Sequence, residues 1–282
     1  MAFVLLEAWF IMRERTLWGK EAAMPYVKSA GVDIYYECQG EGDTILFAHG
    51  AGGNAGIWFE QVAAFSTSYR CVTFDHRTFA RSPADAASIS PVQFRDDALA
   101  ILDALDVELA HLVGQSMGGW TCLRLALDHP DRVRSLTMSC TPGGLPNPEP
   151  TESARNLTRS DDRGTGGVMA TMSRVTAADP VRMQLYQTIN AFNTRFSMTN
   201  LRSLTDPAHA VSRDAVAAIR QPVLFISGAE DPLFPSAQLA GYVPWFTDAR
   251  LEIVQDAGHS PYFEQPDAFN ALLARFLERG NG

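Results

Sequence analysis

The sequence predicts an α/β protein in which a mostly parallel central sheet is flanked by helices and interrupted once by a helical insertion. Short β-rich runs alternate with longer helical patterns from Tyr26 onward, and this rhythm stops after Cys140 and resumes at PVLFIS. Such alternation is typical of βαβ units, whose crossover helices cover both faces of a parallel sheet. The 282 residues are 46% hydrophobic, which is enough to bury the core of one elaborated domain.

Most of the expected elements lie in the first half of the chain. The strand-like runs are VDIYYEC, TILFAHG, RCVTFD, LAHLVG and RSLTMSC, and helices are expected over residues 57–65, over residues 91–105 and after Ser116. Pro91 suits a first helical turn, because its fixed φ and missing N–H cost nothing there. The first two strand-like runs, which precede His49, have the pattern of an antiparallel hairpin.

A helical insertion is expected over residues 145–210, between two parts of one core that comprise residues 24–144 and 211–282. It follows the turn-rich segment TPGGLPNPEP and begins with a polar stretch, after which helical patterns take over. Asp179 is a suitable N-cap for a helix that begins at Pro180. The β rhythm then resumes with PVLFIS, a helix from about Ser236, the strand LEIVQ and a terminal helix over residues 266–278.

Residues 1–23 precede the core and are expected to form an N-terminal extension. Their apolar run resembles an export signal, but no positive charge precedes it, Glu7 interrupts it and no A-x-A-like cleavage site follows it. The run is also too short to span a bilayer. We expect an accessory amphipathic helix, with a peripheral membrane anchor as the alternative.

The charge balance argues against two classes of partner. The net charge is −9 at pH 7 and the pI is near 5.1, so nucleic acid and anionic membrane surfaces would repel the protein. A small-molecule substrate is the expected partner, and a homodimer stays open. The four cysteines, without a CxxC pair, are Cys38, Cys71, Cys122 and Cys140. We therefore expect buried free thiols rather than disulfides or a zinc site, as in a cytoplasmic protein.

The segment GQSMGG places a serine between glycines where a strand-like run gives way to a helix-like one. Gly114, Ser116 and Gly118 form the pattern G-x-S-x-G. A nucleophile on so sharp a turn holds strained backbone angles, and side chains two positions before or after it would collide. The turn lifts Ser116 Oγ clear of the sheet edge, which makes Ser116 the candidate nucleophile.

A serine hydroxyl needs a base to accept its proton, and the imidazole of that base needs an orienting carboxylate. His259 lies in DAGHSPYFEQP, a loop after the strand run LEIV, from which it can reach the turn. Asp231 in SGAEDPLFP follows PVLFIS and so lies at the carboxyl end of a strand, where the acid is expected. The rivals, which are expected to have structural or solvated roles, are His111, His129, His209 and Glu230.

Two backbone N–H groups are candidates for an oxyanion hole. Met117 follows the serine at a helix N-terminus, where an orphan donor and the positive end of the dipole face a developing negative charge. FAHGAGGN, residues 47–54, is rich enough in glycine for its backbone to approach a substrate, and the Ala51 N–H is our second candidate. A phosphate site is not indicated, since the sequence lacks GK[ST] and a helix-opening G-x-G-x-x-G.

Taken in order, these motifs resemble those of the α/β-hydrolase fold family, in particular the small serine hydrolases with a helical cap. The similar motifs, found between about Tyr26 and Leu277, are HGAGGN, TFDHRTFARS, GQSMGG, GAEDPLFP and GHSPYFEQP. The resemblance implies a nucleophile, two partners and two backbone donors at Ser116, Asp231, His259, Ala51 and Met117. It also implies that the insertion over residues 145–210 is a cap over the pocket.

One loop departs from the family pattern D-x-R-G-x-G-x-S. Thr78 and Ala80 stand where both glycines are usual, between Asp75 and Ser82. If those positions need φ above zero, we expect the loop to have a different backbone here and the nearby pocket to change shape.

The expected function is hydrolysis of a small, largely apolar carboxylic ester or lactone through an acyl-enzyme intermediate, with no metal or organic cofactor. Trp58, Trp120 and Phe192 are candidate pocket residues, because aromatic side chains can line an apolar cavity. An aspartate is usual at the nucleophile position in haloalkane dehalogenases and epoxide hydrolases, so Ser116 argues against both.

Three alternatives stay open on the same fold: carbon–carbon bond hydrolysis of a diketone acid, cofactor-free haloperoxidase activity, and a non-enzymatic ligand receptor. A diketone acid would favour a cationic clamp for its carboxylate. The candidates for such a clamp, whose default interpretation is surface charge, are Arg77, Arg81, Arg174 and Arg182.

Overall fold

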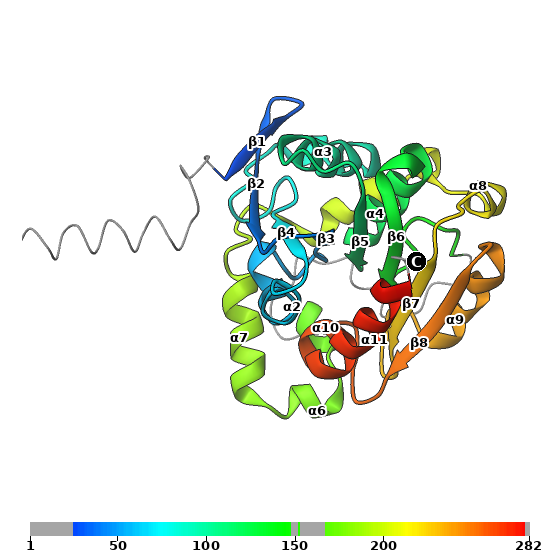
Figure 1. The fold of residues 1–282 in the computed structure, drawn as a ribbon. Helices are drawn as coiled ribbons and strands as arrows, with labels where there is room; N and C mark the ends of the chain where they lie inside the picture. The colour runs from blue at the N-terminus through cyan, green and yellow to red at the C-terminus, as the bar shows by residue number, and fades with distance from the viewer. Residues whose placement is uncertain (1–24, 148–151, 153–166, 280–282) are drawn as a thin grey trace, which may run out of the picture.

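The computed structural model describes residues 25–147, 152 and 167–279, and Figure 1 shows them as a sheet with helices on both faces. The strands lie in the order β1-β2-β4-β3-β5-β6-β7-β8. Their bounds are β1 Tyr26–Ser29, β2 Val32–Gln39, β3 Thr44–Ala48, β4 Arg70–Phe74, β5 Ala110–Gln115, β6 Val133–Ser139, β7 Val223–Gly228 and β8 Ala249–Val254. The predicted fold class, an α/β protein with a mostly parallel sheet, is confirmed.

Helices connect most of these strands. The α-helices are α2 Phe59–Phe65, α3 Pro91–Ala104, α4 Gly118–Asp128, α6 Arg174–Ala177, α7 Pro180–Asn190, α8 Arg213–Ala217, α9 Ser236–Tyr242, α10 Pro261–Glu264 and α11 Pro266–Arg279. The 3₁₀ helices are η1 Ala55–Trp58, η2 Ala86–Ser88, η3 Pro130–Arg132, η4 Val168–Thr171, η5 Met198–Thr205, η6 Pro207–His209 and η7 Val243–Trp245. Pro91 begins α3, as predicted, with the Ser90 hydroxyl accepting from the Gln93 N–H as its N-cap.

The strand pairing shows where one prediction was wrong. β3 is parallel to both β4 and β5, and β5 to β8 continue as parallel neighbours. β2 is antiparallel to β4 rather than to β3, so the hairpin predicted for the two runs before His49 does not form. The reason is that the chain returns from β3 through α2 and places β4 between β3 and β2. The hairpin is instead β1 with β2, joined by Ala30 and Gly31 at φ 46° and 81°, as a type I′ turn requires.

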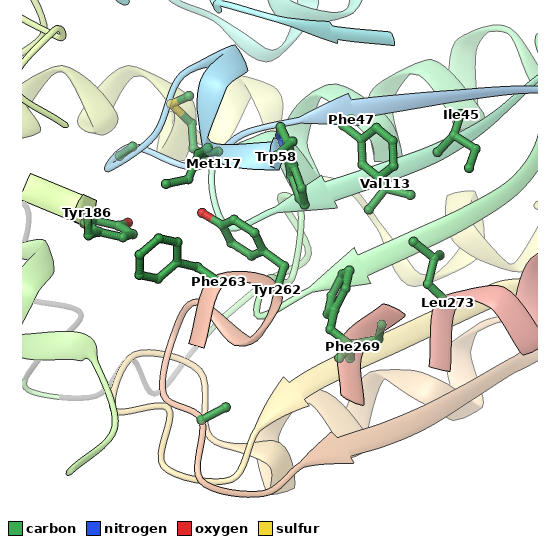
Figure 2. Close-up of a cluster of buried hydrophobic side chains, with 14 of the residues drawn as sticks. Ile45, Phe47, Trp58, Val113, Met117, Tyr186, Tyr262, Phe263, Phe269 and Leu273 are labelled. Carbon is green, nitrogen blue, oxygen red and sulfur yellow. The ribbon is translucent and has the colours of Figure 1, made fainter. Parts of the chain in front are cut away.

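β3 separates two hydrophobic cores. Ile45 and Phe47 belong to the core on one face of the sheet, and Leu46 and Ala48 to the core on the other, as alternation along a strand demands. Every residue of β3 is buried, because a central parallel strand is covered on both faces. Figure 2 shows the first core, to which α2, α10 and α11 contribute, whereas α4, α8 and α9 contribute to the second.

The residues on either side of the predicted insertion, residues 145–210, meet in space, because the Val211 N–H donates to the Gly144 carbonyl at 3.1 Å. The described helices of the insertion are the α-helices α6 and α7, of which α7 is the longer, and the 3₁₀ helices η4, η5 and η6. The Asp179 carboxylate accepts from the first N–H groups of α7, so the predicted N-cap is confirmed. In Figure 1, α6 and α7 lie on the side of the molecule that also carries α2 and α10.

The predicted N-terminal extension, residues 1–23, and most of the predicted polar stretch lie outside the described residues. In the part of the chain that is described, no helix is both long and apolar enough to cross a bilayer. Cys71, Cys122 and Cys140 are buried free thiols, as predicted, whereas Cys38 is an exposed free thiol on β2, near the edge of the sheet.

Candidate active site

Ser116 occupies the sharp turn between β5 and α4. Its φ is 49°, a left-handed value that is strained for a residue with a Cβ. A Cβ added at Gly114 would lie 2.6 Å from Gly118 O, and a Cβ at Gly118 would lie 2.0 Å from Ala48 O. Both positions therefore require glycine, as G-x-S-x-G predicts, and the turn places Ser116 on the wall of a cavity.

Ser116, His259 and Asp231 meet beyond the carboxyl ends of β5, β8 and β7. His259 Nε2 lies 2.8 Å from Ser116 Oγ, and His259 Nδ1 lies 3.1 and 3.0 Å from the two carboxylate oxygens of Asp231. Because the Asp231 carboxylate accepts a hydrogen bond from Nδ1, the proton of the neutral imidazole is assigned to Nδ1. His259 Nε2 is then able to accept the proton of the serine hydroxyl. His259 and Asp231 are only 3% and 5% exposed, so water screens this pair weakly.

The loop of Asp231 holds the carboxylate toward His259. Asp231 Oδ1 also accepts from the N–H groups of Leu233 and Phe234, at 2.8 and 3.2 Å. The rival carboxylate of Glu230 points elsewhere, since its Oε2 accepts from the N–H and Nε of Arg174 at 3.0 and 3.2 Å. Local backbone contacts therefore decide which of the two neighbouring acids faces the imidazole.

The two candidate oxyanion donors lie close to the serine. Met117 stands at the N-cap of α4, and no hydrogen bond among the described residues occupies its N–H. The loop of Ala51 packs on the same turn, because a Cβ added at Gly50 would lie 3.1 Å from Ser116 Cβ and 1.9 Å from Gln115 Oε1. The fold thus brings the loop of Ala51 against the turn of Ser116 from a distant part of the sequence.

Gln115, which sequence reasoning did not single out, connects the serine turn to the histidine. Its side chain is 2% exposed, and its Nε2 donates to the His259 carbonyl at 2.8 Å. In the sequence, Gln115 occupies one of the variable positions of G-x-S-x-G, and no chemistry is expected from those positions. Its contact with His259 joins residues far apart in sequence, which no local pattern indicates.

Sequence reasoning also did not single out His49, whose imidazole is hydrogen-bonded to the loop of Ala51. Its Nδ1–H donates to the Gly50 carbonyl at 2.8 Å, and its Nε2 accepts from the His76 N–H at 3.0 Å. Burial lowers the pKa of His49 to about 4, so the imidazole is neutral at pH 7. The His76 imidazole in turn lies 2.8 Å from Thr121 Oγ1 on α4, which ties the loop to the helix that follows the serine.

Thr78 and Ala80 keep the positive φ values for which glycine is usual, at 75° and 30°. The backbone change that we expected for these substitutions is therefore not seen. Hydrogen bonds hold the loop in this strained form: the Thr78 N–H donates to Ser82 O at 2.8 Å, and the Arg81 N–H donates to the buried carboxylate of Asp75 at 2.9 Å.

A cavity of about 410 Å³ opens beside the nucleophile. Its apolar wall includes Met117, Trp120, Leu204, Leu233 and Phe234, which come from α4, from η5 and from the Asp231 loop. Asp206 and His209 line it as well, together with the exposed Thr205, and so form a polar rim. The cavity can accept an apolar group next to Ser116 and a polar group toward solvent.

Of the three predicted pocket residues, only Trp120 lines this cavity. Trp58 is 0% exposed and packs between Phe47 and Tyr262, with ring centroids at 5.1 and 4.4 Å, as Figure 2 shows. Phe192 follows α7, is 65% exposed and borders a separate cavity of about 300 Å³. Trp58 is therefore a core residue and Phe192 a surface residue, because helical spacing and aromatic character do not reveal which face points to the serine.

None of the four arginines considered as a clamp lines the cavity. Arg77 is buried in a two-pronged pair with Asp97, at 2.6 and 2.8 Å. Arg81 binds Asp75 at 2.8 Å. The side chain of Arg174 is 93% exposed, and Arg182 donates to the Phe263 carbonyl. Among the described residues around the cavity, none is Lys or Arg.

The rival histidines lie away from the proton-transfer geometry. His111 Nδ1 lies 2.7 Å from Ser135 Oγ inside the sheet, and His129 ends α4, in line with their expected structural roles. His209 differs from expectation, because it lines the cavity instead of serving only as structure.

One thiol lies next to the acid and the base. The donor atoms of Cys140, Asp231 and His259 lie within 4.8 Å of one another. Burial raises the pKa of the Cys140 thiol well above its usual value, and the charge of Asp231 adds to this, so the thiol stays protonated. His259 Nδ1 and Asp231 already bind each other.

Comparison with known proteins places this geometry in a family. A sequence profile described as the alpha/beta hydrolase fold matches residues 43–171 and 182–266. RutD of Azorhizobium caulinodans, provisionally named a carbamate hydrolase, is 30% identical over 271 residues, which cover 90% of this chain and 98% of that protein.

Two further relatives differ in the reactions for which they are named. The 2-hydroxy-6-oxo-6-phenylhexa-2,4-dienoate hydrolase of Comamonas testosteroni is 28% identical over 273 residues, covering 87% of this chain and 91% of its own. A solved structure described as an N-acyl homoserine lactone degrading enzyme is 27% identical, with a TM-score of 0.74 over 89% of this chain and 100% of its own. This chain belongs to the α/β-hydrolase fold family and is a hydrolase of that fold.

Proposed function

We propose that this chain is a serine hydrolase that cleaves a small, uncharged, largely apolar carboxylic ester or lactone through an acyl-enzyme. The observation that carries the proposal is the unbroken line from Asp231 through His259 to Ser116, at 3.0 and 2.8 Å, beside the 410 Å³ cavity. A hydroxyl, a base and an orienting acid in hydrogen-bond reach are what nucleophilic catalysis requires.

In the acylation step, His259 Nε2 takes the Ser116 hydroxyl proton while Oγ forms a bond to the substrate carbonyl carbon. The carbonyl electron pair moves onto oxygen, where the N–H groups of Ala51 and Met117 stabilise the negative charge. Collapse of this intermediate breaks the bond to the leaving alkoxide, which receives the proton from His259. Asp231 stabilises the imidazolium between these two proton transfers.

Deacylation repeats the same sequence with water. His259 takes a proton from a water molecule, whose oxygen attacks the acyl carbon of the ester on Ser116. The intermediate then expels Ser116 Oγ, which is reprotonated from His259, and the carboxylic acid leaves. For a lactone the leaving alkoxide stays attached to the acyl chain, so a single hydroxy acid is released.

The charge of the cavity supports an uncharged substrate. Its described lining contains Asp206 and no Lys or Arg, and the net charge of the chain is −9. A diketone acid would bring a carboxylate into this field without a cation to pair with it, and so would the 2-hydroxy-6-oxo-6-phenylhexa-2,4-dienoate for which the relative from Comamonas testosteroni is named. The lactone-degrading neighbour therefore offers the nearer analogy.

We further propose that residues 145–210 form a cap over this site, which contributes Leu204, Asp206 and His209 to its wall. The buried free thiols Cys71, Cys122 and Cys140 support a location in the reducing cytoplasm.

The test combines a covalent probe with a substrate panel. A fluorophosphonate should label the wild type and not Ser116→Ala, and the wild type should hydrolyse neutral short-chain esters or lactones faster than matched substrates that carry a carboxylate. Failure to label the wild type would favour the ligand-receptor alternative. Labelling together with a preference for diketone acids would favour carbon–carbon bond hydrolysis, and would refute the ester and lactone assignment.

A further inference from the structure

The loop that carries His259 is packed directly against the insertion. The His259 N–H donates to the Thr171 carbonyl at 2.9 Å. A Cβ added at Gly258 would lie 2.2 Å from Thr171 O and 2.7 Å from Ser173 N, so the two backbones touch. The position of His259 therefore depends on the insertion as well as on the core.

One buried carboxylate joins the two backbones. Glu264, the last residue of α10, is 4% exposed. Its Oε1 accepts from the N–H groups of Gly258 and Ser260, at 2.9 and 3.0 Å, and its Oε2 accepts from the Ser173 N–H at 2.7 Å. Gly258 and Ser260 flank His259, and Ser173 is the N-cap of α6 in the insertion.

This arrangement is more than a local loop contact. The His259 N–H bonds to Thr171 O and the Ser260 N–H bonds to Glu264, so both peptide planes that meet at the His259 Cα are fixed. These bonds limit where Nε2 can lie relative to Ser116 Oγ. The second oxygen of the same carboxylate is committed to the insertion. A carboxylate without its own proton accepts at both oxygens, whereas an amide in its place would present an NH₂ group to one of the three donors.

We propose that Glu264 is a positioning residue that couples the insertion to the base His259, so that displacement of Ser173 is felt at the imidazole. The inference rests on the proposed function, because it assigns His259 as the base. It predicts that the reactivity of Ser116 depends on an acid that touches neither the nucleophile nor the substrate.

The charge of Glu264 is felt by the buried groups around it. Burial raises the pKa of Tyr186 to about 12, and it raises the pKa of Tyr262 well above its usual value. In both cases the charge of Glu264 acts in the same direction, and it does so for Cys140 as well. These groups and Asp231 are the titratable neighbours through which a change at Glu264 would reach His259.

The test replaces Glu264 with Gln, which keeps the size of the side chain and removes its charge and one acceptor. The rate of fluorophosphonate labelling and kcat should both fall roughly tenfold or more, because small displacements of a catalytic group are costly. The acidic limb of the kcat/KM profile should move to lower pH, because losing a nearby negative charge disfavours the protonated imidazole. A purely structural role would lower the Tm without moving this limb.

Glu230 provides a matched control, because its carboxylate binds Arg174, the residue that follows Ser173 in the insertion. The Glu230 carboxylate accepts from the Arg174 N–H at 3.0 Å and so also joins the insertion to the core. Its contact with the His259 loop is made by the backbone alone, since the Glu230 N–H donates to the Ala257 carbonyl at 2.8 Å, and a change of side chain keeps that bond. Glu230→Gln should leave the labelling rate and the pH profile of the wild type unchanged. If Glu230→Gln and Glu264→Gln changed the rate equally, the coupling through His259 would be refuted.

A second variant keeps the proposal testable if Glu264→Gln does not fold. Glu264→Asp retains the charge but is shorter by one methylene, so it should slow labelling while leaving the acidic limb in place. Wild-type rates in either folded variant would overturn the positioning role and leave the proposed function standing. Absence of labelling in the wild type would instead overturn the proposed function.

Discussion

Two described parts of the insertion are held to the core in different ways. The clamped part, residues 167–190, is bound to the His259 loop by polar contacts. Two of them are buried, Thr171 O with the His259 N–H and the Ser173 N–H with Glu264, and Arg182 adds a partly buried one with the Phe263 carbonyl. The cavity part, residues 198–210, consists of the 3₁₀ helices η5 and η6 and contacts the space in front of Ser116.

The cavity part has weaker ties. Trp120 Nε1 donates to the Leu204 carbonyl at 3.1 Å, and residues 205–208 are exposed. Because 3₁₀ helices have poorer hydrogen-bond geometry than α-helices, this wall yields more easily than the clamped part. The difference teaches that the two parts make different contacts: one part binds the loop that carries His259, and the other lines the cavity beside Ser116.

The largest expected effect comes from forcing the clamped part away from the His259 loop. Gly258→Ala would place a Cβ 2.2 Å from Thr171 O, where backbone must move. We expect about 3 kcal/mol of lost stability and roughly a hundredfold lower turnover, measured by thermal unfolding and ester hydrolysis. Gly241→Ala on α9 meets nothing within 4 Å and should instead leave activity intact. Comparable activities for the two alanine variants would contradict the description of a clamped part.

The buried histidine that supports the Ala51 loop should make the core sensitive to acid. Burial lowers the pKa of His49 to about 4, below its ordinary value of 6.5. The unfolded chain therefore binds a proton that the folded chain refuses, so stability falls as the pH drops from about 6.5 to about 4, by at most about 3 kcal/mol.

The measurement is urea unfolding at several pH values in this window. His49→Asn should be less stable than the wild type at pH 7 but should lose less stability between pH 6.5 and 4. Parallel curves for the two proteins would show that His49 does not carry the acid sensitivity.

A smaller effect is expected from loosening the cavity part. Trp120→Phe removes the hydrogen bond to the Leu204 carbonyl, which should cost about 1 kcal/mol. The KM should change with the acyl chain length of the substrate while kcat for the shortest ester stays near that of the wild type. Trp245→Phe, a similarly half-buried tryptophan on η7, is the matched control and should leave KM unchanged. If kcat fell equally for every substrate, the cavity part would act on the position of His259 rather than on the space for the acyl chain.

The smallest effect is expected from the strained loop that contains Thr78 and Ala80. Ala80 has a φ of 30°, so Ala80→Gly should relieve strain and stabilise the protein by up to about 1 kcal/mol in thermal unfolding. Thr78→Gly should gain less, because Thr78 is 1% exposed and its removal leaves a gap. A loss of stability in Ala80→Gly would mean that the loop is not strained at this position.

Sequence reasoning succeeded where chemistry is written in short motifs. Gly114 is needed because of a close contact with Gly118 in the same turn, and Gly118 because it packs against the backbone of Ala48 on β3. The positions of Asp231 and His259 after consecutive strands follow from the parallel sheet. The structure brings these side chains together with Ser116, as the motif order predicted.

What could not be predicted depends on contacts between distant segments. Gln115 with His259, and Glu264 with Ser173, are pairs that no periodicity reveals, since each depends on how loops meet in space. Trp58 and Phe192 show the same limit, because an aromatic residue at helical spacing carries no signal of which wall it faces. The β1–β2 hairpin was missed because Ala30 takes a left-handed φ that sequence favours only weakly.

The backbone hydrogen bond between Val211 and Gly144 makes the insertion a loop with closed ends, so its removal leaves a gap that a short peptide could bridge. Because Thr171 and Ser173 bind the His259 loop, an exchanged segment would have to keep the clamped part. Substrate choice in such a scaffold can therefore diverge by exchange of the cavity part, while the strands, their loops and the clamped part are inherited together.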